Sequence, residues 1–297
     1  MDKISTTAKI SFSLGIILVV SLFLFLVLFR STGGGYLAQI VSEPTVDDVV
    51  NEETASPIVK EVAVSSAGAY KIGGQELYAF RADKRWPIGS ITKLMTALVA
   101  DRLYLSEKPY ELIEITEEMV RADGDEGGFE SGETIRADDL IKAMMLVSSN
   151  DAANALAIHY GEDKFVALMN ETAKELGMIN TTFADATGIS TQNLSTVEDI
   201  RTLSEFLWKN YTYIFDISQR PSETIIERVS GTKWSLDNIN PFVSRTDFLG
   251  GKAGGTSESE GNLVSIFDVP EREGEVIIIV FGSGDRIAET EKILNNL

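Results

Sequence analysis

The fold is decided by the stretch Trp86-Pro87-Ile88-Gly89-Ser90-Ile91-Thr92-Lys93-Leu94-Met95-Thr96-Ala97. Pro87 and Gly89 break whatever precedes them, and Ser90 is a residue type that often caps a helix. Apolar residues then recur at helical spacing, so the sequence predicts a core-facing helix from Ile91 to about Leu103.

Ser90, at the start of this helix, and Lys93, one turn further in, lie on the same helix face. A serine hydroxyl becomes nucleophilic when a base takes its proton, and a lysine can be that base when burial or another cation lowers its pKa. The N–H groups of a helix N-terminus also suit a developing oxyanion. The pattern recurs at Ser230-Gly231-Thr232-Lys233, between strand-like runs where nothing holds the lysine against the serine. A helix cap followed by a surface lysine explains the first copy equally well.

The composition limits which functions the chain can have. It contains no cysteine, which excludes disulfides and thiolate metal sites, and its single histidine excludes a histidine-rich metal centre. No acidic or serine partner is in view for that histidine, His159, so we predict a structural role. The net charge of −19 argues against nucleic acid and anionic membrane surfaces as partners. We expect no metal and no organic cofactor.

The first part of the chain predicts a membrane anchor. Ser11–Phe29 is a run of 19 residues with no charge, nearly enough to cross a hydrocarbon core about 30 Å thick. We predict a transmembrane anchor over 11–30, with 1–10 in the cytoplasm because the positive charges before the run outweigh the single arginine after it. Residues 31–60, first glycine-rich and then acidic, form a flexible linker to a domain over 61–297 outside the cytoplasm.

The domain is predicted to belong to the α+β class. Strands over Val62–Tyr70 and Leu77–Phe80 precede a helical middle, and further strands and one helix close the chain. The helices are expected at 117–121 (short), 138–146, 151–160, 163–176, 196–209 and 285–295, and the later strands at 225–229, 233–236, 242–247, 262–268 and 275–281. This order describes an antiparallel sheet completed by both ends of the chain, flanked by helices and carrying an inserted all-helical lobe.

Two further motifs carry groups suited to chemistry. Ser148-Ser149-Asn150 lies at a helix–helix junction, where a hydroxyl can relay a proton and an amide can pair with a peptide backbone. Ser149 or Asn150 would serve equally well as an N-cap. Lys252-Ala253-Gly254 offers an ammonium at a strand edge that can attract a carboxylate, and glycines that allow close backbone approach. An ordinary glycine-rich turn is the alternative there.

The order and spacing of the three motifs are more specific than any one of them. Ser148 follows Ser90 by 58 positions (148 − 90), and Lys252 follows Ser148 by 104 (252 − 148). In this the chain resembles the serine D-Ala-D-Ala carboxypeptidases among the low-molecular-weight penicillin-binding proteins, from about Val62 to Leu297. Further matches lie at Asp139-Leu140, Ala152-Ala153, Thr182-Phe183, Gly188, Ser195-Thr196, Asp199 and Asn238-Ile239-Asn240. The resemblance implies a β-lactamase/transpeptidase-like fold and makes 61–297 a D,D-peptidase (penicillin-binding) domain.

The resemblance also implies a mechanism. Ser90 attacks the carbonyl between two D-alanines and becomes acylated, Lys93 is the general base, and Ser148 relays the proton to the leaving amine. The N–H groups of Ser90 and Gly255 form the oxyanion hole, and water then deacylates the enzyme. The implied substrate-binding residues are Asn150, Lys252, Gly254, Gly255 and Thr256. The implied partners are peptidoglycan stem peptides ending in D-Ala-D-Ala, with β-lactams as inhibitors.

One departure from the family pattern leaves alternatives open. Ala253 stands where the family usually has a threonine or serine that binds the substrate carboxylate. The alternatives are therefore a weakly active enzyme and an inactive peptidoglycan-binding homologue, beside a D,D-endopeptidase of the same chemistry. A β-lactamase is disfavoured because no Glu-x-x-Leu-Asn lies between the second and third motifs.

Overall fold

The computed structural model describes residues 62–108, 110–120, 128–272 and 274–297. The predicted cytoplasmic N-terminus, anchor and linker over 1–60 lie outside these residues. Within the described ranges, no helix combines the length and the apolar character that crossing a membrane requires. Where a short helix was predicted at 117–121, residues 117–120 form a turn.

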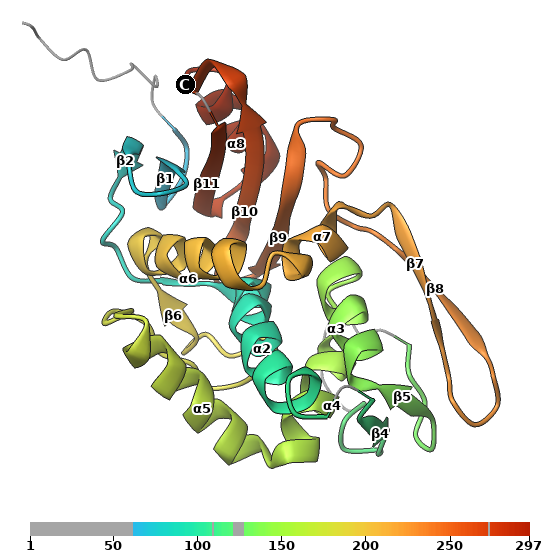
Figure 1. The fold of residues 1–297 in the computed structure, drawn as a ribbon. Coiled ribbons are helices and arrows are strands. Elements are labelled where there is room, and N and C mark those ends of the chain that lie inside the picture. The colour runs from blue at the N-terminus through green and yellow to red at the C-terminus, as the bar shows by residue number, and fades with distance from the viewer. Residues whose placement is uncertain (1–61, 109, 121–127, 273) are drawn as a thin grey trace, which may run out of the picture. The chain divides into compact units, whose positions relative to one another are not determined.

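A five-stranded antiparallel sheet is built from both ends of the described chain, as predicted (Figure 1). Its order is β2 (Glu76–Phe80), β1 (Ser66–Lys71), β11 (Gly274–Ser283), β10 (Glu260–Val269) and β9 (Phe248–Thr256). The early strand β1 therefore lies beside the last strand, with Ala67 opposite Val280. β9 is an edge strand, and its ladder places Lys252 opposite Val264 of β10.

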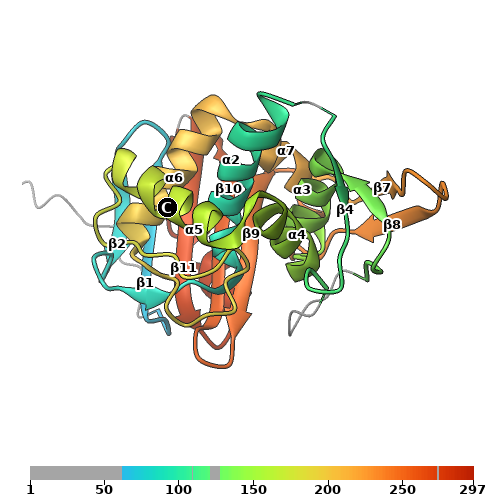
Figure 2. The same ribbon diagram turned by 90° about the horizontal axis from the view of Figure 1, so that it is seen from below.

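The central strand β11 separates two cores. Its sequence is a run of β-branched residues buried on both faces of the sheet. Alternate side chains point to opposite faces, so Ile277 and Ile279 join the core beneath the helical lobe while Ile278 joins the core beneath α8 (Arg286–Leu294). The sheet is thus covered by α8 on one face. Helices that include α6 and α7 cover the other (Figure 2).

The helical lobe lies between β2 and β9 in the sequence. Its first helical segment is a 3-10 turn, η1 (Gly89–Thr92), which leads into α2 (Lys93–Ala100) and ends in a π-helical turn, η2 (Asp101–Leu105). The other helices are α3 (Ala137–Leu146), α4 (Asn150–Tyr160), α5 (Glu162–Glu175), α6 (Val197–Asn210) and α7 (Tyr213–Gln219). The lobe was predicted to be all-helical, but it also contains three small ladders: β3 (Trp86–Pro87) with β6 (Leu194–Ser195), β4 (Leu112–Glu114) with β5 (Thr134–Arg136), and β7 (Ser222–Ile226) with β8 (Lys233–Asp237).

One strand prediction was wrong. Residues 242–247 were expected to form a strand, but they form turns, and the strand begins at Phe248. The apolar character of Phe242 has another cause, because its ring packs against those of Phe248 and Phe267 at centroid distances of 6.2 and 5.3 Å. The glycine-rich run that follows is the edge strand β9 itself, which excludes the turn alternative for Lys252-Ala253-Gly254.

Candidate active site

Ser90 lies in the 3-10 turn η1, and Lys93 follows it one helical turn later. Neither η1 nor α2 has a side-chain hydrogen bond at its N-cap, so the helix-cap interpretation of Ser90 was wrong. Instead the Ser90 hydroxyl accepts a hydrogen bond from Lys93 Nζ at 2.8 Å. Lys93 is fully buried. The serine and the lysine are therefore placed for a direct proton transfer.

The Lys93 ammonium is oriented by two further acceptors. It donates to Asn150 Oδ1 at 2.8 Å and to the backbone carbonyl of Thr187 at 2.7 Å. Asn150 is the first residue of α4, so the second motif reaches the first through this bond. An ammonium has three protons, and its three acceptors here fix the nitrogen beside the Ser90 oxygen.

The Thr187 carbonyl was not identified from the sequence. It lies in a loop that Asp185 shapes, because Asp185 Oδ1 accepts from the Thr187 N–H at 2.7 Å and the Gly188 N–H at 2.6 Å. Gly188 has a φ of +91°, and a Cβ there would lie 2.0 Å from the Gly89 carbonyl oxygen. Only glycine allows this loop to approach the Ser90 turn so closely. The match at Gly188 was the one signal for it in the sequence.

The second motif separates its cap from its site residues. Ser149 is the N-cap of α4, where its hydroxyl accepts from the Ala152 N–H at 3.0 Å. The neighbouring Ser148 does not cap the helix, and its hydroxyl accepts from Lys252 Nζ at 2.9 Å. Lys252 is 2% exposed and also donates to the Ala253 carbonyl at 2.7 Å. The structure therefore joins the second motif to the third, as the resemblance implied.

The glycines of β9 let the edge strand lie against the Ser90 turn. A Cβ at Gly254 would lie 2.8 Å from the Ser90 nitrogen and 2.9 Å from the Ile91 nitrogen. The Gly255 nitrogen is also close, 2.9 Å from the position that a Cβ on Gly89 would take. The two N–H groups expected to form the oxyanion hole, those of Ser90 and Gly255, are thus brought to the same place.

The Thr256 hydroxyl is used by the β9–β10 turn. Its oxygen accepts from the Ser259 N–H at 3.1 Å and from the Glu258 N–H at 3.3 Å. Its part in substrate binding stays a prediction.

Arg286, the first residue of α8, was not identified from the sequence. It donates from Nη1 to the Gly254 carbonyl at 2.6 Å. Burial lowers the pKa of its guanidinium, which remains a cation behind β9.

Two other expectations concern residues outside this cluster. His159 has an acidic partner after all, because its Nε2 lies 3.2 Å from Glu111 Oε1, 48 positions away in the sequence. That hydrogen bond lowers the pKa of Glu111. In the second Ser-x-x-Lys copy, the Ser230 hydroxyl pairs with that of Thr232 at 2.8 Å at the tip of the β7–β8 hairpin.

Comparison with known proteins gives a consistent result. Residues 61–284 match the model of the D-alanyl-D-alanine carboxypeptidase family. A D-alanyl-D-alanine endopeptidase of Escherichia coli is 31% identical over 71% of this chain and 72% of its own. One of Pseudomonas aeruginosa is 30% identical over 80% and 78%. Penicillin-binding protein D2 of Listeria monocytogenes, in its ampicillin-bound form, superposes with a TM-score of 0.69 at 29% identity, over 79% of this chain and 97% of that one.

Proposed function

Because the chain belongs to the D-alanyl-D-alanine carboxypeptidase family, we propose that it trims peptidoglycan stem peptides through an acyl-enzyme on Ser90. The observation that carries this proposal is the 2.8 Å contact between Lys93 Nζ and Ser90 Oγ, inside a cluster that also joins Ser148 to Lys252. A peptide-binding module without catalysis needs neither a nucleophile nor a buried lysine beside it.

Acylation requires Lys93 in its neutral amine form, so that Nζ can take the Ser90 proton while the Ser90 oxygen attacks the carbonyl carbon between the two D-alanines. The N–H groups of Ser90 and Gly255 donate to the oxyanion that forms. When the C–N bond breaks, the leaving amine gains a proton from Ser148, and Ser148 gains in turn the proton that Lys93 took from Ser90. The Lys252 ammonium, 2.9 Å from Ser148 Oγ, stabilises the negative charge that develops on this oxygen during the transfer.

Substrate binding is assigned to groups around these atoms. The Asn150 amide accepts from Lys93 through Oδ1, and its nitrogen is the donor for the peptide backbone of the substrate. Lys252 attracts the terminal carboxylate. Gly254 leaves room for the substrate along the β9 edge, and Thr256 adds a hydroxyl at its end. Water then attacks the ester carbonyl, and Ser90 recovers its proton.

A D,D-endopeptidase is the second candidate, because two of the relatives most similar in sequence carry that name. The chemistry at Ser90 would be the same, and the two activities differ only in whether the leaving amine belongs to a free D-alanine or to a second stem peptide. Ala253, which lacks the hydroxyl expected for the free carboxylate, also favours this candidate.

The chain is further proposed to be a single-pass membrane protein with its catalytic domain outside the cytoplasm. The support is the uncharged run Ser11–Phe29 and the distribution of positive charge around it. Stem peptides of the cell wall lie outside the membrane, so this topology would bring enzyme and substrate to the same side.

The test is the intact mass of the full chain, in detergent, after incubation with benzylpenicillin. We expect a stable adduct on the wild type and none on Ser90→Ala. Release of D-alanine from a pentapeptide, compared with cleavage of a cross-linked dimer, then decides between carboxypeptidase and endopeptidase. A folded wild type that forms no adduct would instead indicate a peptidoglycan-binding homologue without catalysis.

A further inference from the structure

Ser148 depends on the end of α3 for its position. Its φ of +59° lies in the left-handed region that residues other than glycine rarely adopt, and such a conformation persists only where its surroundings enforce it. Within the last turn of α3, the Val147 N–H donates to the Ala143 carbonyl at 3.1 Å. From outside, the Ile239 N–H donates to the Leu146 carbonyl at 3.1 Å. The second bond comes from the segment that follows the β7–β8 hairpin.

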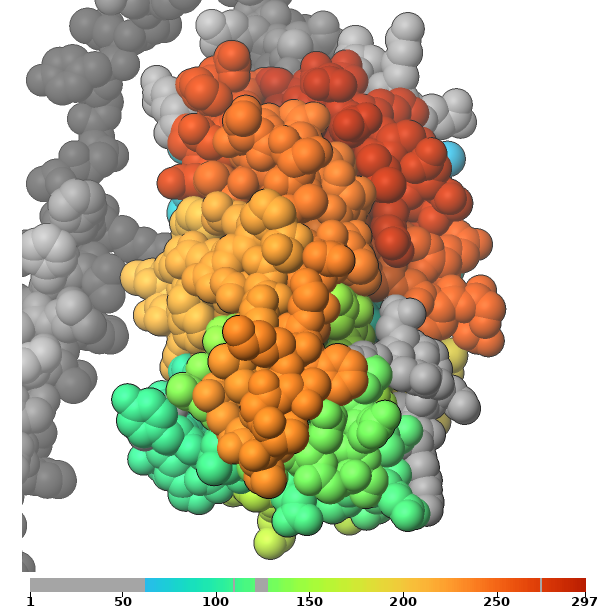
Figure 3. Space-filling model, turned by 90° about the vertical axis from the view of Figure 1, so that its right-hand side faces the viewer, coloured from blue at the N-terminus to red at the C-terminus, as the bar shows by residue number. Residues whose placement is uncertain are grey.

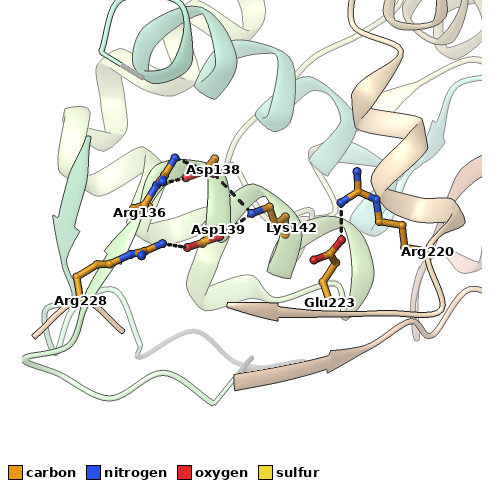
Figure 4. Close-up of polar contacts among 7 residues, drawn as sticks. All are labelled: Arg136, Asp138, Asp139, Lys142, Arg220, Glu223 and Arg228. Atoms are coloured by element: carbon orange, nitrogen blue, oxygen red, sulfur yellow. Dashed lines mark hydrogen bonds and ion pairs between the residues drawn. The ribbon is translucent and has the colours of Figure 1, made fainter. Parts of the chain in front are cut away.

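The other end of α3 is tied to the same hairpin by an ion pair (Figure 4). Asp139 lies in the first turn of α3, and its side chain is 4% exposed. Its Oδ1 accepts from Lys142 Nζ at 2.7 Å, and its Oδ2 accepts from Arg228 Nη2 at 2.7 Å. Lys142 belongs to α3 itself and cannot fix the helix relative to other elements. Arg228 follows β7 in the hairpin, so its bond to Asp139 does fix α3 relative to another element.

Arg228 is in turn fixed by the β4–β5 ladder. Its backbone N–H donates to the Thr134 carbonyl at 2.9 Å. The preceding residue, Glu227, accepts the Thr134 N–H at 2.9 Å. The hairpin, orange in Figure 3, accordingly lies across the green surface formed by the segment that includes β5 and α3. The Arg228 guanidinium therefore reaches Asp139 from a backbone that is hydrogen-bonded to Thr134 of β5.

The segment that carries the hairpin also contacts β9. Before the hairpin, the Ser218 hydroxyl of α7 accepts from the Gly251 N–H at 2.9 Å. At its base, Asn238 Nδ2 donates to the Ser218 carbonyl at 2.8 Å. One continuous segment, 213–240, thus bonds to α3, which ends two residues before Ser148, and to β9, which carries Lys252.

We propose that Arg228 is a positioning residue for the proton relay. Its ion pair with Asp139 fixes α3 against the β7–β8 hairpin, which keeps the Ser148 hydroxyl within hydrogen-bond distance of Lys252. This inference rests on the proposed function, since the position of Ser148 matters only where Ser148 passes a proton to the leaving amine. Lys142 retains part of the charge balance at Asp139, so the loss of Arg228 frees the helix without leaving the carboxylate unpaired.

The test compares Arg228→Gln with Arg220→Gln in the full chain. Arg220 pairs with Glu223 of the same hairpin (Figure 4), so its variant removes a more exposed arginine–carboxylate pair without touching the α3 contact. We expect Arg228→Gln to lower kcat for D-alanine release roughly tenfold, since misplacing a catalytic group by about 1 Å can cost a hundredfold. KM should change less than about threefold, because the β9 groups that bind substrate remain in place.

Two further variants make the assignment specific. Arg228→Lys keeps the charge and should restore most of kcat. Asp139→Asn combined with Arg228→Gln should be no slower than Asp139→Asn alone, because the two residues act through one contact.

A kcat within twofold of wild type for Arg228→Gln, or an equal loss for Arg220→Gln, would overturn the inference. Should Arg228→Gln not fold, Asp139→Asn takes its place, because it weakens the same contact from the other side, and a kcat for Asp139→Asn within twofold of wild type would then overturn the inference. A wild type that is not acylated by benzylpenicillin would refute the proposed function instead.

Discussion

At the scale of single residues, strained backbone marks the site. Ser148 and Glu260 are two of the three non-glycine residues with positive φ among the described residues, at +59° and +54°. Each such residue costs about 1–3 kcal/mol of folding free energy. Ser148 lies between α3 and α4, where its hydroxyl contacts Lys252 Nζ, whereas Glu260 begins β10 after the β9–β10 turn and the third such residue, Arg81, follows β2. Of the three, Ser148 alone therefore brings its side chain into the candidate site.

Ala253 gives a prediction at the same scale. It is 8% exposed and packs with Leu263 in the core beneath α8, whereas Lys252 beside it bonds to Ser148. We expect Ala253→Thr to raise kcat/KM for D-alanine release roughly ten- to a hundredfold, because a hydrogen bond to a charged group contributes about 1.5–3 kcal/mol. Steady-state kinetics on a D-Ala-D-Ala peptide measures this.

The control for that prediction is Ala253→Val, which adds the same volume as threonine but no hydroxyl. If crowding under α8 dominated, both variants would be slower than the wild type. If the hydroxyl binds the carboxylate, only the threonine variant is faster. Equal rates for threonine and valine would remove Ala253 as the explanation for any low activity.

At the scale of elements, periodicity predicted those whose contacts are local. The spacing of apolar residues from Ile91 gave the helix that carries Lys93, although its last turn, Asp101–Leu105, is π-helical. The loop that supplies the Thr187 carbonyl could not be predicted in the same way. Asp185 shapes it locally, and the contact of Gly188 with Gly89 places it against the Ser90 turn. Gly89 and Gly188 are far apart in the sequence, and a contact between such residues leaves no periodic pattern.

The β7–β8 hairpin provides a pH prediction. The carboxylate of Glu227 accepts N–H groups of Thr134, Val229 and Ser230. Hydrogen bonds from the Ser230 side chain first, and then from these backbone groups, lower its pKa from 4.5 to about 2. Because the folded-state pKa is the lower one, Glu227 stabilises the fold above about pH 4.5, and this contribution is lost as the pH falls towards 2.

Urea unfolding of the wild type and Glu227→Gln, measured at several pH values, tests this. The wild type should be the more stable at pH 6, and the gap between the two should narrow below about pH 4.5 and close as the pH falls through about 2. Glu114→Gln, on an exposed position of β4, corrects for the general effect of removing a negative charge. A gap that stays constant with pH would show that the ionised carboxylate does not secure the hairpin.

At the scale of the whole molecule, the sheet and its inserted lobe followed from the order of the predicted elements, but their assembly into a site did not. Ser90, Ser148 and Lys252 come from η1, the end of α3 and β9, and they meet because β1 lies beside β11 and places the lobe against the β9 edge. Only the resemblance to a family predicted that the three motifs lie in one site. Composition and periodicity alone left each motif with an ordinary structural explanation.

The last prediction concerns the attachment of the whole chain to a membrane. With a net charge of −19, the protein should be repelled by anionic lipid surfaces, so membrane association would have to come from the apolar run Ser11–Phe29. We expect a fluorescent penicillin to label the wild type in the membrane fraction of cells and to do so without entering the cytoplasm. Val20→Arg with Leu24→Arg should abolish the labelling of intact cells and leave the protein in the soluble fraction, since a central arginine opposes insertion by about 2.5–3.5 kcal/mol. The matched replacements Val20→Leu and Leu24→Val should leave it on the membrane. A wild type recovered in the soluble fraction would refute the anchor while leaving the chemistry at Ser90 intact.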